Sequence, residues 1–148
     1  MAAVKSRNTK PELLVRKFLF SKGLRYRLYS KLPGHPDLVF PKYKTVVFVD
    51  GCFWHGHEGC RYYRLPKTNE DFWRHKITLN QARDYRFNIE LRLLGWRVLR
   101  VWECDLRSSE ARQATLDRLY ESITGPAPDA HTEIASVAAE PQAPYGND

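Results

Sequence analysis

Three cysteines and one histidine are the residues best suited to holding a metal ion. Cys52, His57 and Cys60 share a segment without regular apolar periodicity, and Cys104 follows a strand-like run further along the chain. Three thiolates with one imidazole match a closed, tetrahedral structural zinc site. Zinc would order a segment that has too little apolar material to order itself. The competing interpretation is three core cysteines and a surface histidine, because the spacing lacks paired Cys-x2-Cys knuckles.

Two aspartates stand at the ends of neighbouring strand-like runs. Asp37 opens one run, and Asp50 follows the apolar run 45–49. Magnesium takes one or two protein carboxylates together with water and substrate phosphates. Asp37 with Asp50, or with a neighbouring backbone carbonyl, would therefore suit a site that cleaves phosphodiesters. Pro36-Asp37 is also a common turn dipeptide, and the two carboxylates taken alone favour a turn.

His55 lies between the candidate zinc ligands, but a tetrahedral count does not require it. An imidazole titrates near neutral pH, so His55 could take a proton from an attacking water. The alternative is that His55, rather than His57, binds the metal. Residue types and spacing leave both assignments open.

Large aromatic side chains follow the first cysteine in a segment that offers little reason to bury them. Phe53 and Trp54 are expected to be exposed, and Trp73 at the start of a later helix would join them. Exposed rings can insert between base steps of a duplex. Arg74 and Lys76 beside Trp73 would contact phosphates. Core packing is the usual role of an isolated tryptophan, and only the clustering with basic residues favours DNA binding.

Charge is unevenly distributed along the 148 residues. The whole chain has 24 Lys and Arg against 17 Asp and Glu, a net charge of +7. The segment 126–148 has four acidic residues and no Lys or Arg, so residues 1–125 hold 24 basic and 13 acidic groups, a difference of +11. A polyanion such as DNA is the expected partner, and a merely soluble basic surface is the alternative.

Several classes of protein are excluded. There is no apolar run long enough to span a membrane, and no secretory or lipidation motif opens the sequence. We therefore expect a cytoplasmic protein with no membrane partner. An odd number of cysteines in that reducing compartment also argues against a disulfide framework.

The apolar pattern predicts alternating helices and strands that would position these groups. Thr9 and Glu12 form a capping box, and Gly23 ends that helix. Thr68 is expected to cap a long helix, with Asp71 at its third position. The expected elements are helix 10–22, strands 24–29, 37–40 and 45–49, a long helix ending at Gly95, strand 96–102, and a last helix opened by Ser108 or Ser109.

The inward-facing side chains and the order of elements indicate one α/β domain over residues 1–125. Strands 37–40 and 45–49 should form a hairpin, with 45–49 inside the sheet. Residues 126–148, rich in Ala and Pro, are expected to be disordered. The side chains expected to face the core are Leu14, Phe18, Leu13 and Val15 in the first helix, Phe72, Ile77, Leu91 and Leu94 in the second, and Leu116, Leu119 and Ile123 in the last.

Taken together, four motifs resemble the very-short-patch-repair DNA mismatch endonucleases, the Vsr family. The resemblance covers roughly residues 5–123. Its motifs are Leu32-Pro33-Gly34-His35-Pro36-Asp37, Val46-Val47-Phe48-Val49-Asp50-Gly51-Cys52-Phe53-Trp54-His55, Phe72-Trp73, and Leu94-Gly95-Trp96-Arg97-Val98-Leu99 with Val101-Trp102-Glu103-Cys104.

The resemblance implies a fold like that of type II restriction endonucleases and a magnesium-dependent DNA endonuclease activity. Family members nick one strand 5′ of the thymine in T:G mismatches that arise from deaminated 5-methylcytosine, within the site of a companion cytosine-5 methyltransferase. Mismatch-repair proteins and a repair polymerase are further implied partners. A nick in one strand needs only one copy of the enzyme, so we expect a monomer.

The resemblance also implies roles for individual residues. Asp37 holds catalytic magnesium with the backbone carbonyl of Val49, and His55 acts on the water nucleophile. Glu12 and Asp84 match further positions near the active site. The implied zinc ligands are Cys52, His57, Cys60 and Cys104, and the implied intercalating rings are Phe53, Trp54 and Trp73.

This sequence departs from the family pattern at three places. The best-known members have Thr at Val49 and His at Asp50, which leaves open whether Asp50 also binds metal. The spacing from His57 to Cys60 is one residue longer than the tightest in the family. Family chains usually carry a basic arm before the Lys5-Ser6-Arg7 region, so either the arm is absent here or the natural start lies upstream of Met1, and we expect the latter. Lys5 and Arg7 are expected to contact DNA. Alternatives are a related nuclease of a mobile element or restriction system, and a non-catalytic zinc-stabilised DNA-binding module.

Overall fold

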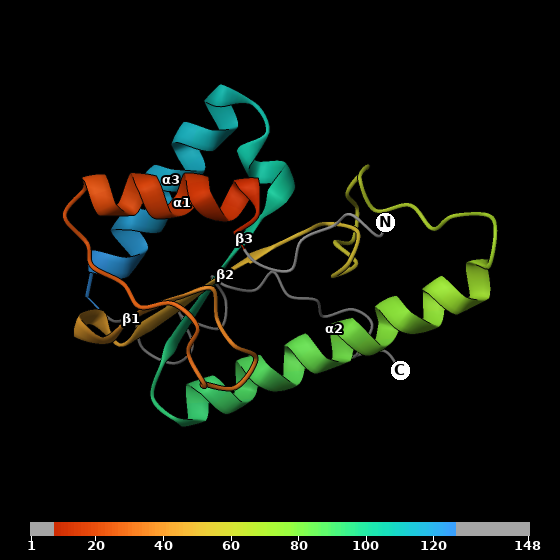
Figure 1. Cartoon of the computed structure of the whole chain (residues 1–148), viewed down its shortest axis with the longest axis horizontal. Helices are drawn as coiled ribbons and strands as arrows, with labels where there is room; N and C mark the ends of the chain where they lie inside the picture. The colour runs from red at the N-terminus through yellow and green to blue at the C-terminus, as the bar shows by residue number, and fades with distance from the viewer. Residues whose placement is uncertain (1–7, 127–148) are drawn as a thin grey trace.

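A computed structural model describes residues 8–126 and shows a mixed three-stranded sheet between two helical layers (Figure 1). Strand β2 is central, antiparallel to β1 and parallel to β3. The expected α/β class is therefore confirmed, as is the 37–49 hairpin. The elements are α1 Lys10–Ser21, β1 Leu38–Phe40, the 3₁₀ turn η1 Pro41–Tyr43, β2 Thr45–Asp50, α2 Glu70–Leu93, β3 Arg97–Trp102, the 3₁₀ turn η2 Glu103–Leu106, and α3 Ser109–Thr124.

The face of the sheet under α1 and α3 carries the larger core. Val47 and Val49 of β2 point to this side and pack with Val15 and Leu19 of α1 and with α3. The helix starts follow local capping, because Thr9 Oγ1 accepts a hydrogen bond from the Glu12 amide and Ser108 Oγ accepts one from that of Ala111. The predicted start of α1 is thereby confirmed, and α1 ends at Ser21, one residue before the predicted end, with Lys22 as its cap and Gly23 after it.

The opposite face of the sheet lies against α2 (Figure 1). Val46 and Phe48 point to this side and pack with Leu91 of α2 and Val98 of β3. Because side chains alternate along a strand, Asp50 follows on the same face as Phe48. The end of β2 therefore presents a carboxylate to the long helix.

One predicted strand, one predicted helix cap and two predicted core residues are wrong. Residues 24–29 form no strand in the described structure. A single pair of backbone hydrogen bonds, between Arg27 and Val39, attaches this segment to β1. Asn69 rather than Thr68 is the cap of α2, and its side chain makes no capping hydrogen bond. Phe72 and Leu94 are exposed rather than inward: the N-terminal turns of α2, which carry Phe72, extend past the sheet (Figure 1), and Leu94 is the cap that follows the helix.

In α1 the buried apolar side chains are Val15 and Leu19, and Glu12 is buried with them, whereas Leu13 is 48% exposed and so was also assigned wrongly. The predicted inward residues Ile77, Leu91, Leu116, Leu119 and Ile123 are all buried. The expectations for segment 126–148 and for the N-terminal arm fall almost entirely outside residues 8–126. Within that range no helix is both long and apolar enough to cross a membrane.

Candidate functional site

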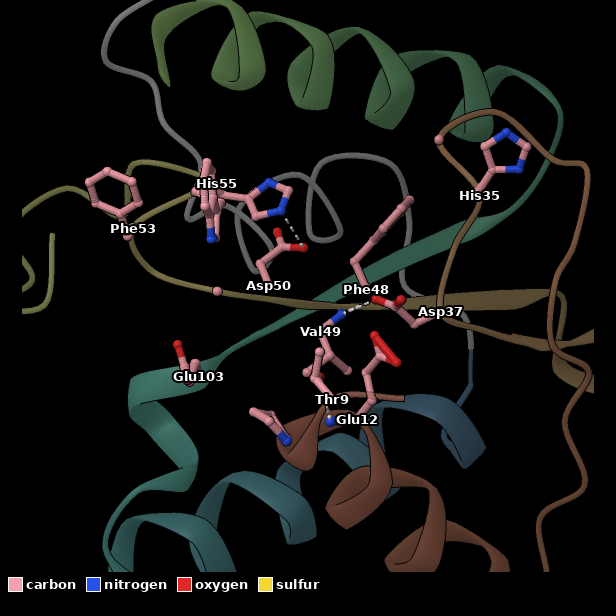
Figure 2. Close-up of a pocket in the computed structure, with 14 residues that line it drawn as sticks. Thr9, Glu12, His35, Asp37, Phe48, Val49, Asp50, Phe53, His55 and Glu103 are labelled. Atoms are coloured by element: carbon pink, nitrogen blue, oxygen red, sulfur yellow. Dashed lines mark hydrogen bonds and ion pairs between the residues drawn. The ribbon is translucent and has the colours of Figure 1, made fainter. Parts of the chain in front are cut away.

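A pocket of about 750 Å³ lies at the end of β2, between α1 on one side and α2 on the other (Figure 2). The 51–60 loop, which continues from β2, forms part of its wall. Both Asp37 and His55 line the pocket. Its acidic lining residues are Glu12, Asp37, Asp50 and Glu103, and among residues 8–126 no Lys or Arg lines it.

Asp37 is held against the end of β2. Its Oδ2 accepts a hydrogen bond of 2.7 Å from the backbone N–H of Val49. Burial raises the pKa of Asp37 more than this hydrogen bond lowers it, and the charges of Glu12 and Asp50 raise it further, to about 7. A nearby cation would stabilise the charged form of this carboxyl group. A raised pKa is therefore expected for a metal-binding carboxylate when no metal is bound.

His55 lies between two carboxylates. Its Nδ1 is 2.6 Å from Asp84 Oδ2, and its Nε2 is 3.7 Å from Asp50 Oδ1. Burial lowers the pKa of His55, but the charge of Asp50 and the hydrogen bond and charge of Asp84 outweigh it, so the net shift is upward. A carboxylate can only accept, so Asp84 keeps the proton on Nδ1 and leaves Nε2 directed toward Asp50.

Asp50 is paired with Arg100, a residue that the sequence analysis did not single out. Asp50 is buried and accepts from Arg100 Nη1, and Arg100 Nη2 donates to Asn88 Oδ1 over 2.7 Å. The guanidinium offsets the charge of Asp50 from the α2 side of the sheet. Asp50, His55 and Asp84 bring their ligand atoms within 4.8 Å of one another, whereas Asp37 is not part of that group.

The four residues with soft ligand atoms meet on the other side of the 51–60 loop. The ligand atoms of Cys52, His57, Cys60 and Cys104 all lie within 4.8 Å of one another, and Cys104 Sγ is 3.5 Å from His57 Nδ1. Ligand atoms around a tetrahedral zinc ion lie roughly 3.5–3.8 Å apart. The donor set and its spacing fit zinc. The structure places His57, and not His55, among the thiols.

Burial and neighbouring thiols disfavour thiolates in this cluster when it holds no metal. Burial is the largest cause that raises the pKa of Cys104, to about 11, and it also raises that of Cys52. Burial lowers the pKa of His57, whose ring stacks on Trp102 with centroids 4.0 Å apart. A bound cation would stabilise the thiolates and balance their charge, so the cluster is suited to a metal rather than to free thiols.

Two amides of α2 hold the loop that links the pocket and the thiol cluster. Asn80 Nδ2 donates to the carbonyl of Trp54 over 2.9 Å, and Gln81 Nε2 donates to that of Gly56 over 2.8 Å. The sequence analysis missed both, and also Arg100, Asn88 and Glu103. A signal for α2 was present, because its buried or inward-facing residues recur at three- and four-residue spacing: Ile77, Gln81, Asp84, Asn88 and Leu91.

The aromatic residues form a cluster beside the pocket. The rings of Phe53, Trp54 and Trp73 contact one another edge to face with centroids 5.2–5.7 Å apart. Each is half-buried rather than freely exposed, because the three rings cover one another. Phe72 packs on Trp73 from the solvent side and is 59% exposed. Four aromatic rings therefore lie together next to the acidic pocket.

The predicted phosphate contacts on α2 are exposed. Arg74 pairs with Glu70 one turn earlier, and Lys76 faces solvent. An exposed ion pair of this kind contributes at most a few tenths of a kcal/mol, so Arg74 can exchange Glu70 for a phosphate at little cost. Lys5 and Arg7, also expected to contact DNA, lie outside the described residues.

Comparison with known proteins identifies the family. Residues 1–61 match the family model described as DNA mismatch endonuclease Vsr. The chain is 40% identical over 93% of its length to the DNA mismatch endonuclease Vsr of Escherichia coli K12, covering 89% of that protein. It is 50% identical to the type II nicking enzyme V.XorIIP of Xanthomonas oryzae, over 82% of this chain and 89% of the relative. It is 49% identical to V.NmeAIP of Neisseria meningitidis, also a type II nicking enzyme, over 83% and 88%. The chain belongs to the Vsr family of DNA mismatch endonucleases.

Proposed function

We propose that this endonuclease nicks one strand of duplex DNA 5′ of the thymine in a T:G mismatch, in very short patch repair. The observation that carries the proposal is the acidic pocket with Asp37 and His55, set beside the cluster of aromatic rings. The pocket offers groups for phosphodiester hydrolysis, and the rings offer a means to open a mispaired duplex. The restriction-endonuclease-like fold is part of the same proposal.

The charge of the pocket is the argument for a divalent cation. Four carboxylates line the pocket, with no Lys or Arg from the described residues beside them, and they would repel a phosphodiester. Asp37 and the backbone carbonyl of Val49 would hold magnesium, with Glu12 acting on its water shell. When bound, the ion would neutralise the phosphate and stabilise the charge that develops on its oxygens.

His55 would act on the water that attacks phosphorus. Its neutral form, with the proton on Nδ1 held by Asp84, has Nε2 available to accept a proton from water. Asp50 lies 3.7 Å from Nε2 and helps to orient the ring. Arg100, which is paired with Asp50, offsets the negative charge there. Water adds to phosphorus and the 3′ oxygen departs, which leaves 3′-hydroxyl and 5′-phosphate ends. The intact pocket supports this reading over a non-catalytic DNA-binding module.

The cysteine cluster would hold structural zinc and thereby position the rings. Cys52 precedes Phe53 and Trp54 directly, so an ion bound by the four ligands would fix the base of the loop that presents both rings. We propose that Phe53, Trp54 and Trp73 insert beside the mismatch, while Arg74, Lys76, Lys5 and Arg7 contact the backbone. The single catalytic domain, residues 1–125, would act as a monomer in the cytoplasm.

A second candidate keeps the chemistry and changes the setting. Two of the relatives described above are named type II nicking enzymes, which favours an enzyme that accompanies a restriction-modification system. The companion methyltransferase of that system would then define the sequence around the mismatch. Both candidates predict a nick, and they differ in which methyltransferase sites support it.

A nicking assay tests the proposal and separates the two candidates. T:G duplexes embedded in a panel of cytosine-5 methyltransferase sites are incubated with the zinc-loaded protein, with magnesium or with a chelator of magnesium. We expect a single nick 5′ of the thymine, in one or a few of the sites, that requires magnesium. Equal cleavage of matched duplexes, or nicking that persists without any divalent cation, would reject the proposal.

A further inference from the structure

Two smaller cavities adjoin the central pocket. One, of about 400 Å³, shares Glu12, His35 and Asp37 with it, and the other, of about 250 Å³, shares Pro11 and Glu103. Figure 2 shows His35 and Glu103 on opposite sides of the central pocket. We name these cavities the His35 end and the Glu103 end. Because each shares lining residues with the centre, the three cavities lie in a row, and we call this row the groove.

The charge of the lining changes along this groove. In the part of the chain that the structure describes, four carboxylates and no Lys or Arg line the centre. The Glu103 end adds three basic residues, Lys10, Arg107 and Arg112, beside the carboxylate of Glu103. The His35 end adds Arg16 and Lys31 to the two carboxylates that it shares with the centre. The groove is therefore acidic in the middle, where a divalent cation would bind, and has added basic side chains at both ends.

At the Glu103 end, Lys10 is the cation most available to a ligand. Arg112 donates to the carbonyls of Leu106 and Arg107, so it ties η2 to α3. Arg107 lies 3.7 Å from Glu103 and against the ring of Tyr62. Lys10, the first residue of α1, is exposed. The two arginines shape the cavity, and Lys10 can reach into it.

At the His35 end, Lys31 has the corresponding position. Arg16 Nη2 is 3.5 Å from Glu12 Oε1, and both side chains are largely buried. Arg16 therefore offsets the charge of Glu12 and lowers the repulsion that a phosphate would meet there. Lys31 is exposed on the loop before His35 and supplies a cation that no carboxylate of the lining is shown to engage.

We infer that this groove is the track of the cleaved DNA strand, with one backbone phosphate at each end, bound by Lys10 and by Lys31. The inference rests on the proposed function, because it takes the scissile phosphate to lie in the centre. A strand laid along the groove presents phosphates at regular intervals, and contacts to phosphates on both sides hold its register without reading sequence. The two lysines would thus position the strand for the cut.

Three lysine variants test the ends of the groove. Lys10→Ala and Lys31→Ala each remove one proposed contact. Lys17→Ala is the matched control, because Lys17 is an exposed lysine of the same helix as Lys10 and lines none of the three cavities. In a salt series of duplex binding, each end variant should show a log–log slope smaller by about 1 than that of the unaltered protein. The control should keep the slope.

A neutral-phosphate scan then locates each contact. Duplexes carry one methylphosphonate, which removes a single charge, at successive positions around the nick. For the unaltered protein, neutralising a contacted phosphate should lower kcat/KM by roughly threefold. Lys10→Ala should be insensitive at one such position and Lys31→Ala at another, in the same strand and on opposite sides of the nick. This loss of additivity identifies each lysine with its phosphate.

The outcomes separate failure of the inference from failure of the proposed function. If both end variants bind and nick like Lys17→Ala, or if their insensitive positions lie on one side of the nick or in the uncut strand, the groove is not the strand track. If the unaltered protein nicks none of the duplexes, the proposed function fails. The salt slopes with plain duplex would still show whether Lys10 and Lys31 contact phosphate, and unchanged slopes would overturn the inference.

Discussion

The acidic pocket and the thiol cluster lie on either side of one short loop, yet they are built on opposite principles. His55 points to Asp50 and Asp84, whereas His57, two residues later, points to three cysteines. The pocket is open, lined by hard oxygen ligands, and its charges are partly balanced by protein partners such as Arg100. The thiol cluster is small and made mainly of soft sulfur ligands, and burial disfavours its thiolates. The pocket is suited to a reaction, and the thiol cluster is suited to holding the loop in one conformation.

The comparison shows how a loop with little apolar content can present reactive and aromatic groups together. The loop 51–60 buries Cys52 but half-exposes Phe53 and Trp54. Burial of side chains alone could not order it, because its rings are needed outside. A metal ion bound by the cysteine cluster would order the loop. Asn80 and Gln81 of α2 contribute as well, because they donate hydrogen bonds to two carbonyls of the loop. Four perturbations test this division of roles, in order of falling effect.

Replacing Asp37 should separate activity from folding most sharply. Asp37→Asn keeps the shape of the side chain but removes the charge that would hold a cation, so we expect nicking to fall by at least roughly 10³-fold with mismatch binding retained. Asp37→Ala should behave alike. Nicking rates under single-turnover conditions and binding by gel shift measure both properties. Normal turnover of either variant would contradict the assignment.

The same substitution should stabilise the protein in the absence of divalent cations. The pKa of Asp37 is about 7, above its ordinary value of 3.8, so the folded state holds an extra proton between these pH values. The stability of the unaltered protein therefore falls as pH rises from about 4 toward 7. Asp37→Asn should lose this part of the pH dependence and unfold at a higher temperature near pH 8. Identical melting profiles would show that Asp37 is not perturbed.

Replacing a thiol should affect folding first and activity second. Cys104→Ser removes one of four ligands, and we expect about 2–5 kcal/mol lower stability together with loss of bound zinc. Metal content of the purified protein and urea unfolding provide the measurements. A variant that retained one zinc per chain at full stability would contradict the ligand set.

The pH dependence of nicking should report on His55. Its pKa is raised above 6.5 by Asp50 and Asp84 against the lowering effect of burial, so the base form increases, and the rate rises, as pH passes through that raised value. Asp84→Asn removes one raising charge and should move the rising limb to lower pH. We also expect a rate loss of roughly tenfold to a hundredfold from the weaker orientation of the ring. An unmoved limb would indicate that another group titrates.

The smallest effect should come from two glycines of the loop. Gly56 and Gly59 both have positive φ, but a Cβ at Gly56 would lie 2.3 Å from Gln81 Nε2, whereas one at Gly59 meets nothing within 4 Å. Gly59→Ala should cost about 1 kcal/mol of stability from backbone strain alone. Gly56→Ala should cost about 1–2 kcal/mol more, because α2 must shift. Equal costs, measured by urea unfolding, would show that the contact with Gln81 contributes nothing.

Local patterns were sufficient for much of the scaffold and insufficient at its edges. Thr9, Glu12 and Gly23 mark α1 correctly because capping depends on neighbours in sequence. The run 24–29 has strand-like residues, but among residues 8–126 it forms only one bridge, from Arg27 to Val39 of β1. Phe72 has the apolar character of a core residue but lies beyond the sheet, where it packs on Trp73 and stays 59% exposed. Propensity cannot indicate which part of a long helix will find a partner.

What the amino-acid sequence determined by itself was the chemistry available: three thiols, an imidazole for each of two sites, carboxylates at strand ends, and rings beside basic residues. Its motifs also carried the family resemblance. Only the tertiary structure decided which histidine faces which ligands, that Arg100 pairs with Asp50 fifty residues away, and that Asp84 orients His55. The physical reason is that side-chain direction in a loop depends on contacts from distant elements, here α2 and β3, which spacing along the chain does not encode.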